Sequence, residues 1–276
     1  MKKMLTDVHT HSTFSFDGID TLDKMLEAAH KKGVAFYGVA EHFNYDSCEE
    51  YVKQEPQDID EEAYFHKARH LQDDYAGCMN VLVGAEFGYT EDKTALNRYL
   101  AVYEKYRPDF VVNSIHNKDG WDYIVRKPYY HADGTLKDKK QAYGEYLQLV
   151  KRSLDAPYPY DIVAHVGYCI RYAPYDDVSI TLAEFGAEID DVLKGVIQRD
   201  KILEVNSGYK GGLCLATEEM LRRYYQLGGR KVSFASDAHN TERILEKREQ
   251  IVALLKEIGF TYITVPCKNE HIKVEI

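Results

Sequence analysis

The sequence predicts an α/β protein whose strands close into a barrel of seven β/α units. Short apolar runs rich in β-branched and aromatic residues alternate with longer segments of helical periodicity along the whole chain. Seven such units follow one another without a Pro-, Gly- or Ser-rich linker between them. The length of 276 residues also fits, because β/α barrels typically have about 250 residues. We therefore expect one domain spanning residues 1–276.

The predicted strands are the short apolar runs. They are residues 4–8, 35–40, 81–87, 110–115, 162–166, 202–205 and 231–235. Strands that are separated by helices and buried on both faces run parallel to one another. A closed barrel satisfies this pattern, and an open, doubly wound sheet is the alternative arrangement.

Helical segments lie between these strands. They are residues 21–32, 61–75, 140–154, 182–198, 217–227 and 241–258. In the first of them, apolar residues recur at spacings of three, one and three, which is one face of a helix, and Gly33 ends the segment. The segment 117–138 is longer than barrel loops usually are, and such long loops are often lids.

Charge and composition exclude several classes of partner. The chain has 35 Lys and Arg against 45 Asp and Glu, a net charge of −10, with no basic stripe, so nucleic-acid binding is disfavoured. No run approaches 18 apolar residues, which predicts no membrane span. Asp7 comes before any apolar stretch, so we expect no signal peptide and a cytoplasmic location. Five scattered cysteines without a Cys-x-x-Cys pair exclude a ribbon-type zinc site.

Histidines and carboxylates gather where the predicted strands end. In a β/α barrel all these ends open onto the same face, so residues far apart in sequence converge on one cavity. The set comprises His9, His11, Asp17, His42, Glu86, His116, His165, Asp237 and His239. Imidazoles with a shared carboxylate suit zinc, manganese or iron. Nine candidate ligands are too many for one metal with about four protein ligands, so we expect two to three divalent ions.

The motifs that carry these residues resemble those of the PHP (polymerase and histidinol phosphatase) superfamily. They run in family order over residues 7–239: His9-Thr10-His11-Ser12, Ser15-Phe16-Asp17-Gly18, Glu41-His42, Gly84-x-Glu86, Ser114-Ile115-His116, His165-Val166-Gly167 and Ser236-Asp237-Ala238-His239. The resemblance implies a distorted, seven-stranded, TIM-like barrel with a trinuclear metal centre.

The resemblance also implies how the ligands are shared among three metals. The first metal would be held by His9, His11, Glu86 and Asp237. Glu86 would bridge to a second metal, held also by His116 and His165. The third would be held by Asp17, His42 and His239, and many family members have histidine where Asp17 stands. Glu86 and Asp237 are accordingly candidate catalytic residues as well as ligands.

Within the superfamily, the chain is most similar to stand-alone histidinol-phosphate phosphatases. The length matches, and the motif ending at His116 leads into Asp119-Gly120-Trp121-Asp122-Tyr123. The family pattern after Gly208 usually continues with a basic residue and a proline-containing turn, whereas residues 209–215 contain no proline. The resemblance implies a small phosphorylated substrate, L-histidinol phosphate, cleaved to L-histidinol and phosphate.

Four residues are candidates for contact with the substrate. Arg171 is a candidate catalytic and phosphate-binding residue, because a guanidinium fork matches two phosphoryl oxygens. Its alternative role is a surface ion pair with Asp176 or Asp177. Lys210 is a second candidate for the phosphate. Trp121 and Tyr168 are candidates for lining the binding site of the substrate's organic group, with ordinary aromatic packing as the alternative.

Three other functions are weighed against this one. The nearest is a PHP-family phosphoesterase acting on a nucleotide or on another sugar or cyclic phosphate. A metal-dependent amidohydrolase also opens with His-x-His, but it needs a single aspartate after the last strand, whereas here Asp237 and His239 come as a pair. A non-enzymatic metal-binding or polymerase-accessory module is disfavoured by the intact set of ligands.

Overall fold

Seven parallel strands form the central sheet of the computed structural model, which describes residues 4–45, 47–54, 57–268 and 270–276. The strand order is β1-β2-β3-β4-β7-β8-β9, with every neighbouring pair parallel. The strands are β1 (Leu5–Asp7), β2 (Val34–Phe43), β3 (Asn80–Gly88), β4 (Phe110–Ser114), β7 (Ile162–Val163), β8 (Ile202–Asn206) and β9 (Val232–Ala235). The predicted parallel arrangement is confirmed.

The two edge strands of the sheet meet and nearly close it into a barrel. Backbone hydrogen bonds join the segment that contains and follows β1 to the segment that contains and follows β9. The Val8 N–H donates to the Phe234 carbonyl at 3.3 Å, and the Asp237 N–H donates to the His9 carbonyl at 3.0 Å. These bonds lie partly beyond the strand ends, so the closure is irregular. The expected distorted seven-stranded barrel is confirmed, and the open, doubly wound sheet is wrong.

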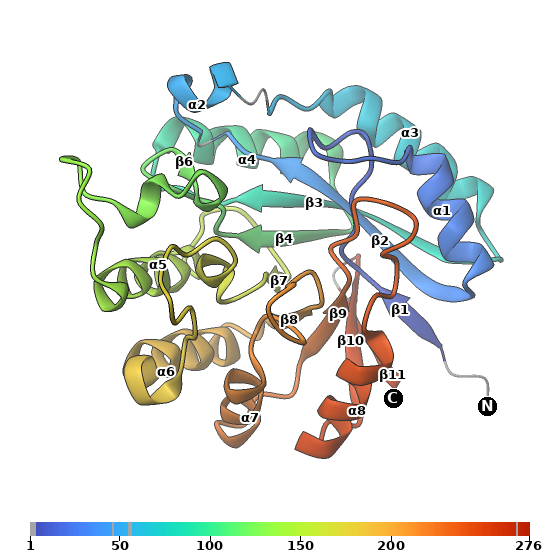
Figure 1. Cartoon of the computed structure of the whole chain (residues 1–276). Helices are drawn as coiled ribbons and strands as arrows, with labels where there is room; N and C mark the ends of the chain where they lie inside the picture. The colour runs from blue at the N-terminus through green and yellow to red at the C-terminus, as the bar shows by residue number, and fades with distance from the viewer. Residues whose placement is uncertain (1–3, 46, 55–56, 269) are drawn as a thin grey trace.

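Helices surround the strands (Figure 1). They are α1 (Leu22–Lys31), α2 (Glu49–Gln54), α3 (Glu61–Asp74), α4 (Lys93–Tyr106), α5 (Lys139–Ser153), α6 (Leu182–Gln198), α7 (Glu218–Gln226) and α8 (Arg248–Ile258). Helix α1 buries the apolar face that its sequence predicts, formed by Leu22, Met25, Leu26 and Ala29. The larger apolar core therefore lies between the helices and the outside of the barrel.

Two predicted boundaries were wrong, and a long helix was missed. The last helix begins at Arg248 instead of residue 241, because the Lys32 ammonium binds the carbonyls of Thr241, Glu242 and Ile244 at 2.9–3.1 Å and holds a loop there. Strand β7 ends at Val163, two residues before His165 adopts a positive φ of 25°. Helix α4 was not predicted, although it buries Ala95, Tyr99 and Val102 at helical spacing.

A C-terminal hairpin, also not predicted, packs into the barrel. Its antiparallel strands are β10 (Tyr262–Cys267) and β11 (Glu270–Glu275). Val265 and Val274 join the interior cluster that contains residues from the barrel strands, such as Phe110. The Lys268 N–H donates to the carbonyl of Asp109, the residue before β4, at 3.0 Å. The hairpin therefore lies at the amino end of the strands, away from the carboxyl ends that carry the histidines.

The segment 117–138 projects beyond the arrowheads of β3 and β4 (Figure 1). It contains the short hairpin β5 (Asn117–Lys118) and β6 (Trp121–Asp122), followed by 3₁₀ turns at Tyr123–Val125 and Lys127–Tyr129. The predicted long insertion thus lies at the carboxyl end of the barrel. Among the described residues, none of the helices is long and apolar enough to cross a membrane.

The hairpin contact yields a first prediction, on stability. Val265→Ala removes two buried methyl groups from the barrel interior, and we expect the free energy of unfolding to fall by about 2–3 kcal/mol. Glu275→Ala, at an exposed position of the same hairpin, should change it by less than about 0.5 kcal/mol. Urea unfolding of both variants measures the difference. Equal stabilities would mean that the hairpin does not support the barrel.

Candidate metal centre

All nine predicted ligands lie at the carboxyl end of the barrel strands. His42 and Glu86 are inside β2 and β3, near the ends of these strands, and the others follow their strands directly or, for Asp17, in the next loop. A cavity of about 790 Å³ opens above them. The ligands that line it are Asp17, His42, His116, His165, Asp237 and His239. His9, His11 and Glu86 are fully buried beneath its floor.

The first predicted ligand set is brought together around one point. The Nε2 atoms of His9 and His11 are 3.1 Å apart. They lie 3.4 and 3.6 Å from Oε2 of Glu86. Oδ1 of Asp237 is 3.3 Å from the His11 Nε2. Two imidazoles and two carboxylates therefore direct four donor atoms at a common centre.

The second set uses the other oxygen of Glu86. Its Oε1 lies 3.2 Å from Nε2 of His116 and 3.1 Å from Nε2 of His165. These two nitrogens are 3.3 Å apart. Because each oxygen of Glu86 faces a different group of imidazoles, the side chain has the geometry of a bridging carboxylate.

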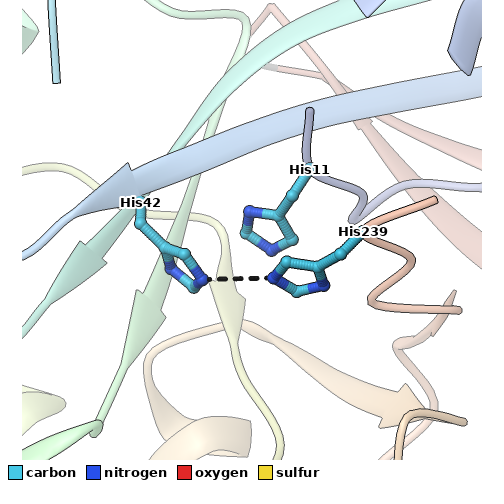
Figure 2. A group of neighbouring side chains, drawn as sticks. All are labelled: His11, His42 and His239. Carbon is cyan, nitrogen blue, oxygen red and sulfur yellow. Dashed lines mark hydrogen bonds between the residues drawn. The ribbon is translucent and has the colours of Figure 1, made fainter. Parts of the chain in front are cut away.

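The third set lies closer to the cavity mouth. His42 and His239 approach each other with their Nε2 atoms 3.4 Å apart, beside the ring of His11 (Figure 2). Asp17 contributes Oδ1 at 3.6 Å from the His42 Nε2 and Oδ2 at 3.2 Å from the His239 Nε2. The His42 Nδ1 also reaches Glu86 Oε2 at 2.7 Å. The third set is therefore joined to the other two through His42.

The outer nitrogens of the imidazoles show which inner nitrogens carry lone pairs. Nδ1 of His9 faces Glu204, Nδ1 of His116 faces Asn44 Oδ1, and Nδ1 of His239 faces the Asp237 carbonyl. Each partner atom is an acceptor, so these Nδ1 atoms hold the proton and each Nε2 presents a lone pair. His11 is held likewise, because the Ser15 hydroxyl that it meets already donates to Glu41.

Donor atoms that face one another at these distances fit a cation between them. The Nε2 atoms of His9 and His11 are only 3.1 Å apart. Burial acts to lower the pKa of His9, but the carboxylates of Glu86 and Glu204 raise that pKa well above its ordinary value, so this buried cluster favours a positive charge. Oε2 of Glu86 is buried and accepts no hydrogen bond of good geometry among the described residues, although His42 Nδ1 lies 2.7 Å away. Three overlapping groups of donors in this region have the spacing of a metal site. Nitrogen and carboxylate donors in this arrangement fit divalent transition metals.

Sequence reasoning missed the buried carboxylate that orients the first two sets. Oε1 of Glu204 is 2.6 Å from Nδ1 of His9, and Oε2 accepts from the backbone N–H of His165 at 2.9 Å and from Asn206 at 3.0 Å. The side chain is fully buried within β8. A charged residue inside an apolar strand was the available indication, because such residues are almost never buried without partners.

Opposing effects set the charge of the two carboxylates at the centre. Burial by itself would raise the pKa of Asp237, but the Arg171 guanidinium and His11 hold that pKa well below its usual range. Burial likewise acts to raise the pKa of Glu86, and the imidazoles of His9 and His116 lower it well below the ordinary value. Both groups are therefore ionised and available to cations.

Arg171 lies inside the cavity. Its Nη2 donates to Oδ2 of Asp237 at 2.8 Å and to Oδ1 of Asn206 at 3.2 Å. The alternative, a surface ion pair with Asp176 or Asp177, is wrong, because the side chain is only 15% exposed and its ion pair is with Asp237. Gly208 allows this placement, since a Cβ there would lie 2.6 Å from Nη2.

The other predicted substrate contacts divide between the cavity and its surroundings. Lys210 and Tyr168 line the cavity, the first exposed and the second buried. Trp121 does not line it. Its ring packs against Tyr51, with centroids 6.0 Å apart, and under the Lys127 ammonium at 5.0 Å. The contacts of Trp121 are therefore those of ordinary aromatic packing, which was the alternative to a substrate contact.

Comparison with known proteins gives consistent results. The family model of the PHP domain matches residues 7–208. A probable histidinol-phosphatase of Clostridium acetobutylicum is 30% identical over 245 residues, which are 87% of this chain and 89% of that protein. A histidinol-phosphatase of Lactococcus lactis subsp. lactis is 25% identical over 263 residues, 94% of this chain and 93% of that protein.

One solved structure resembles the fold over its whole length. It is the histidinol phosphate phosphatase of Lactococcus lactis subsp. lactis, complexed with zinc, L-histidinol and phosphate. The TM-score is 0.85 at 23% sequence identity, covering 99% of this chain and 100% of that chain. The likeness establishes a shared fold.

The contacts of Glu204 yield a second prediction, on metal affinity. Glu204→Gln removes the charge that holds the proton on Nδ1 of His9, so metal affinity should fall by about 10- to 100-fold. Glu249→Gln, an exposed glutamate on α8, is the matched control and should leave affinity unchanged. Titration of each metal-loaded variant with a chelator measures the difference. Wild-type affinity in Glu204→Gln would show that this carboxylate does not support the ligands.

Proposed function

The chain belongs to the PHP domain family, and on this basis we propose that it is a metal-dependent phosphatase converting L-histidinol phosphate to L-histidinol and phosphate. The observation that carries the proposal is the arrangement of three ligand sets, joined by Glu86 and His42, between the floor and the mouth of one cavity. The names of the relatives from Clostridium acetobutylicum and Lactococcus lactis support the choice of substrate.

We propose that these sets hold two to three divalent ions, zinc, manganese or iron. The ligands would be divided as the resemblance implies, with Glu86 shared between the first and second ions. The chemistry that such ions supply when bound is a water of lowered pKa and positive charge toward the phosphoryl oxygens. Phosphate monoesters hydrolyse very slowly without catalysis, so both contributions are needed.

The chain's own residues bind and orient the phosphoryl group in this proposal. Arg171 is held by Asp237 and Asn206 through one terminal nitrogen, and its buried Nε has no partner among the described residues. We propose that the remaining donors of the guanidinium contact phosphoryl oxygens. Lys210, exposed at the wall of the same cavity, would attract the incoming phosphate dianion.

The proposed reaction has a direct test, which is the third prediction. The metal-loaded protein should cleave L-histidinol phosphate with a higher kcat/KM than nucleotides, sugar phosphates or phosphodiesters. Chelation should abolish turnover, and zinc, manganese or iron should restore it, because the buried donors need a cation. Phosphate release with metal analysis of the same samples measures both. Full activity in metal-free protein, or preference for a nucleotide, would contradict the proposal.

The role of Arg171 gives the fourth prediction. With metals in excess, Arg171→Ala should lower kcat/KM by about 10- to 100-fold, the scale of one charged hydrogen-bonding group. The inhibition constant of inorganic phosphate should rise with it. Arg171→Lys should recover only part of the activity, since an ammonium cannot reproduce the fork.

The control for this experiment is Arg152→Ala, at an arginine paired with Glu91 outside this cavity. It should retain wild-type kinetics. Unchanged phosphate inhibition in Arg171→Ala at full metal content would exclude contact between this guanidinium and the phosphoryl group. Arg171 would then serve only to orient Asp237.

A further inference from the structure

Three carboxylates line the cavity, and two of them already have charged or ligand partners. Asp17 lies between His42 and His239, and Asp237 pairs with Arg171 and His11. The third is Asp122, at the end of β6 in the long insertion. Its side chain forms no ion pair within 4 Å with a Lys, Arg or His of the described residues, although Asp122 is only 5% exposed. Burying a carboxylate without a cationic partner costs free energy, which indicates that a bound ligand supplies the positive charge.

The hydrogen bonds of Asp122 leave half of its carboxylate free. Oδ1 accepts from the backbone N–H of Ile124 at 2.7 Å and from the hydroxyl of Tyr168 at 3.4 Å. Oδ2 makes no hydrogen bond among the described residues. Capping the 3₁₀ turn that follows requires one oxygen only, and an exposed residue would serve as well. The cap therefore explains the position of Oδ1 and leaves Oδ2 available to the cavity.

The ring of Tyr168 connects this carboxylate to the candidate metal centre. Its centroid is 5.4 Å from the ring of His116 and 5.0 Å from the ring of His165, while its hydroxyl faces Asp122. The carboxylate thus lies one aromatic side chain away from the second ligand set. A substrate with its phosphate at the ligands can place a group a few bonds further along at Asp122.

Apolar side chains also line the cavity. Phe16, Ile124 and Val125 line it, yet each is 40% exposed or more. Exposed apolar residues next to a buried carboxylate fit a ligand that has an apolar body and a positive charge. L-histidinol phosphate has this character, because its amino group is on the carbon adjacent to the phosphorylated CH₂ and an imidazole ring follows.

We propose that Asp122 is a specificity-determining residue that binds the ammonium group of the substrate. It would thereby select aminoalkyl phosphates over phosphate esters whose organic group is uncharged. The proposal rests on the phosphatase function proposed above. The phosphate end is recognised at the ligand sets and Arg171, and the ammonium end at Oδ2 of Asp122. A phosphate monoester without an amine at this distance from its phosphate cannot make both contacts and is therefore selected against.

The test compares two phosphate esters that differ only at the group facing Asp122. They are 2-aminoethyl phosphate and propyl phosphate, each measured as a substrate and as an inhibitor of 4-nitrophenyl phosphate hydrolysis by metal-loaded protein. The wild type should prefer the amine by at least about tenfold. Asp122→Asn keeps the cap of Ile124 and removes the charge, so most of this preference should be lost, a fall of about tenfold or more.

The matched control is Asp119→Asn in the same insertion. Asp119 has an 82% exposed side chain, pairs with Lys118, and has a positive φ of 54° that asparagine tolerates. This variant should keep the wild-type preference and melting temperature. No preference in the wild type, or an unchanged preference in Asp122→Asn, would overturn the proposal.

The outcomes also separate this proposal from the proposed function. If the protein prefers the amine through Asp122 but does not cleave L-histidinol phosphate, the ammonium site is supported and the assigned substrate is wrong. If the protein cleaves L-histidinol phosphate with no dependence on Asp122, the proposed function is supported and the ammonium site is wrong. Equal losses for the charged and neutral esters in Asp122→Asn would place Asp122 in support of the ligands and reject its role in selection.

Discussion

The buried carboxylate of Glu86 is the group on which the whole centre depends. Its two oxygens lie 2.7–3.6 Å from nitrogens of five imidazoles, from His9, His11, His42, His116 and His165. Without this negative charge, the five imidazoles would face one another with no carboxylate between them. No carboxylate would then be shared between neighbouring cation sites. The strand that carries Glu86 is central in the sheet, so the position is fixed by ladders on both sides.

The barrel separates the part of the molecule that gives stability from the part that carries the ligands. At the amino end, the C-terminal hairpin inserts Val265 and Val274 into the interior. At the carboxyl end, His165 and Asp237 adopt positive φ values of 25° and 53°, which are unfavourable for these residue types. Their backbone N–H groups are held by Glu204 and by the His9 carbonyl. Contacts among the ligands and their supports therefore stabilise the strained conformations.

The sequence predicted the ligands better than it predicted their supports. The parallel strands align all strand ends, so identifying the histidines and carboxylates at those ends was sufficient to bring eight residues together, and Asp17 joins them from the next loop. Glu204 was missed because the residue pattern does not reveal which polar side chain fixes a ring proton. Helix α4 was missed because its buried face includes tyrosine, and the hairpin because it lies outside the repeating strand–helix pattern. Trp121 was a candidate for contact with the substrate, with aromatic packing as the alternative, and its actual neighbours, Tyr51 and Lys127, depend on how the insertion folds.

The charges around the cavity explain why binding of metal and of phosphate must be linked. The chain carries a net charge of −10, and several basic side chains that line the cavity are already compensated. Arg171 is paired with Asp237, and Arg243 with Glu246. The other two, Arg126 and Lys210, are exposed to solvent, so the chain alone supplies little positive charge at the buried ligand sets, while a phosphate dianion requires it. Cations bound by Glu86 and the imidazoles would reverse the sign of the potential at the cavity floor, so the affinity for phosphate depends on the occupancy of the ligand sets.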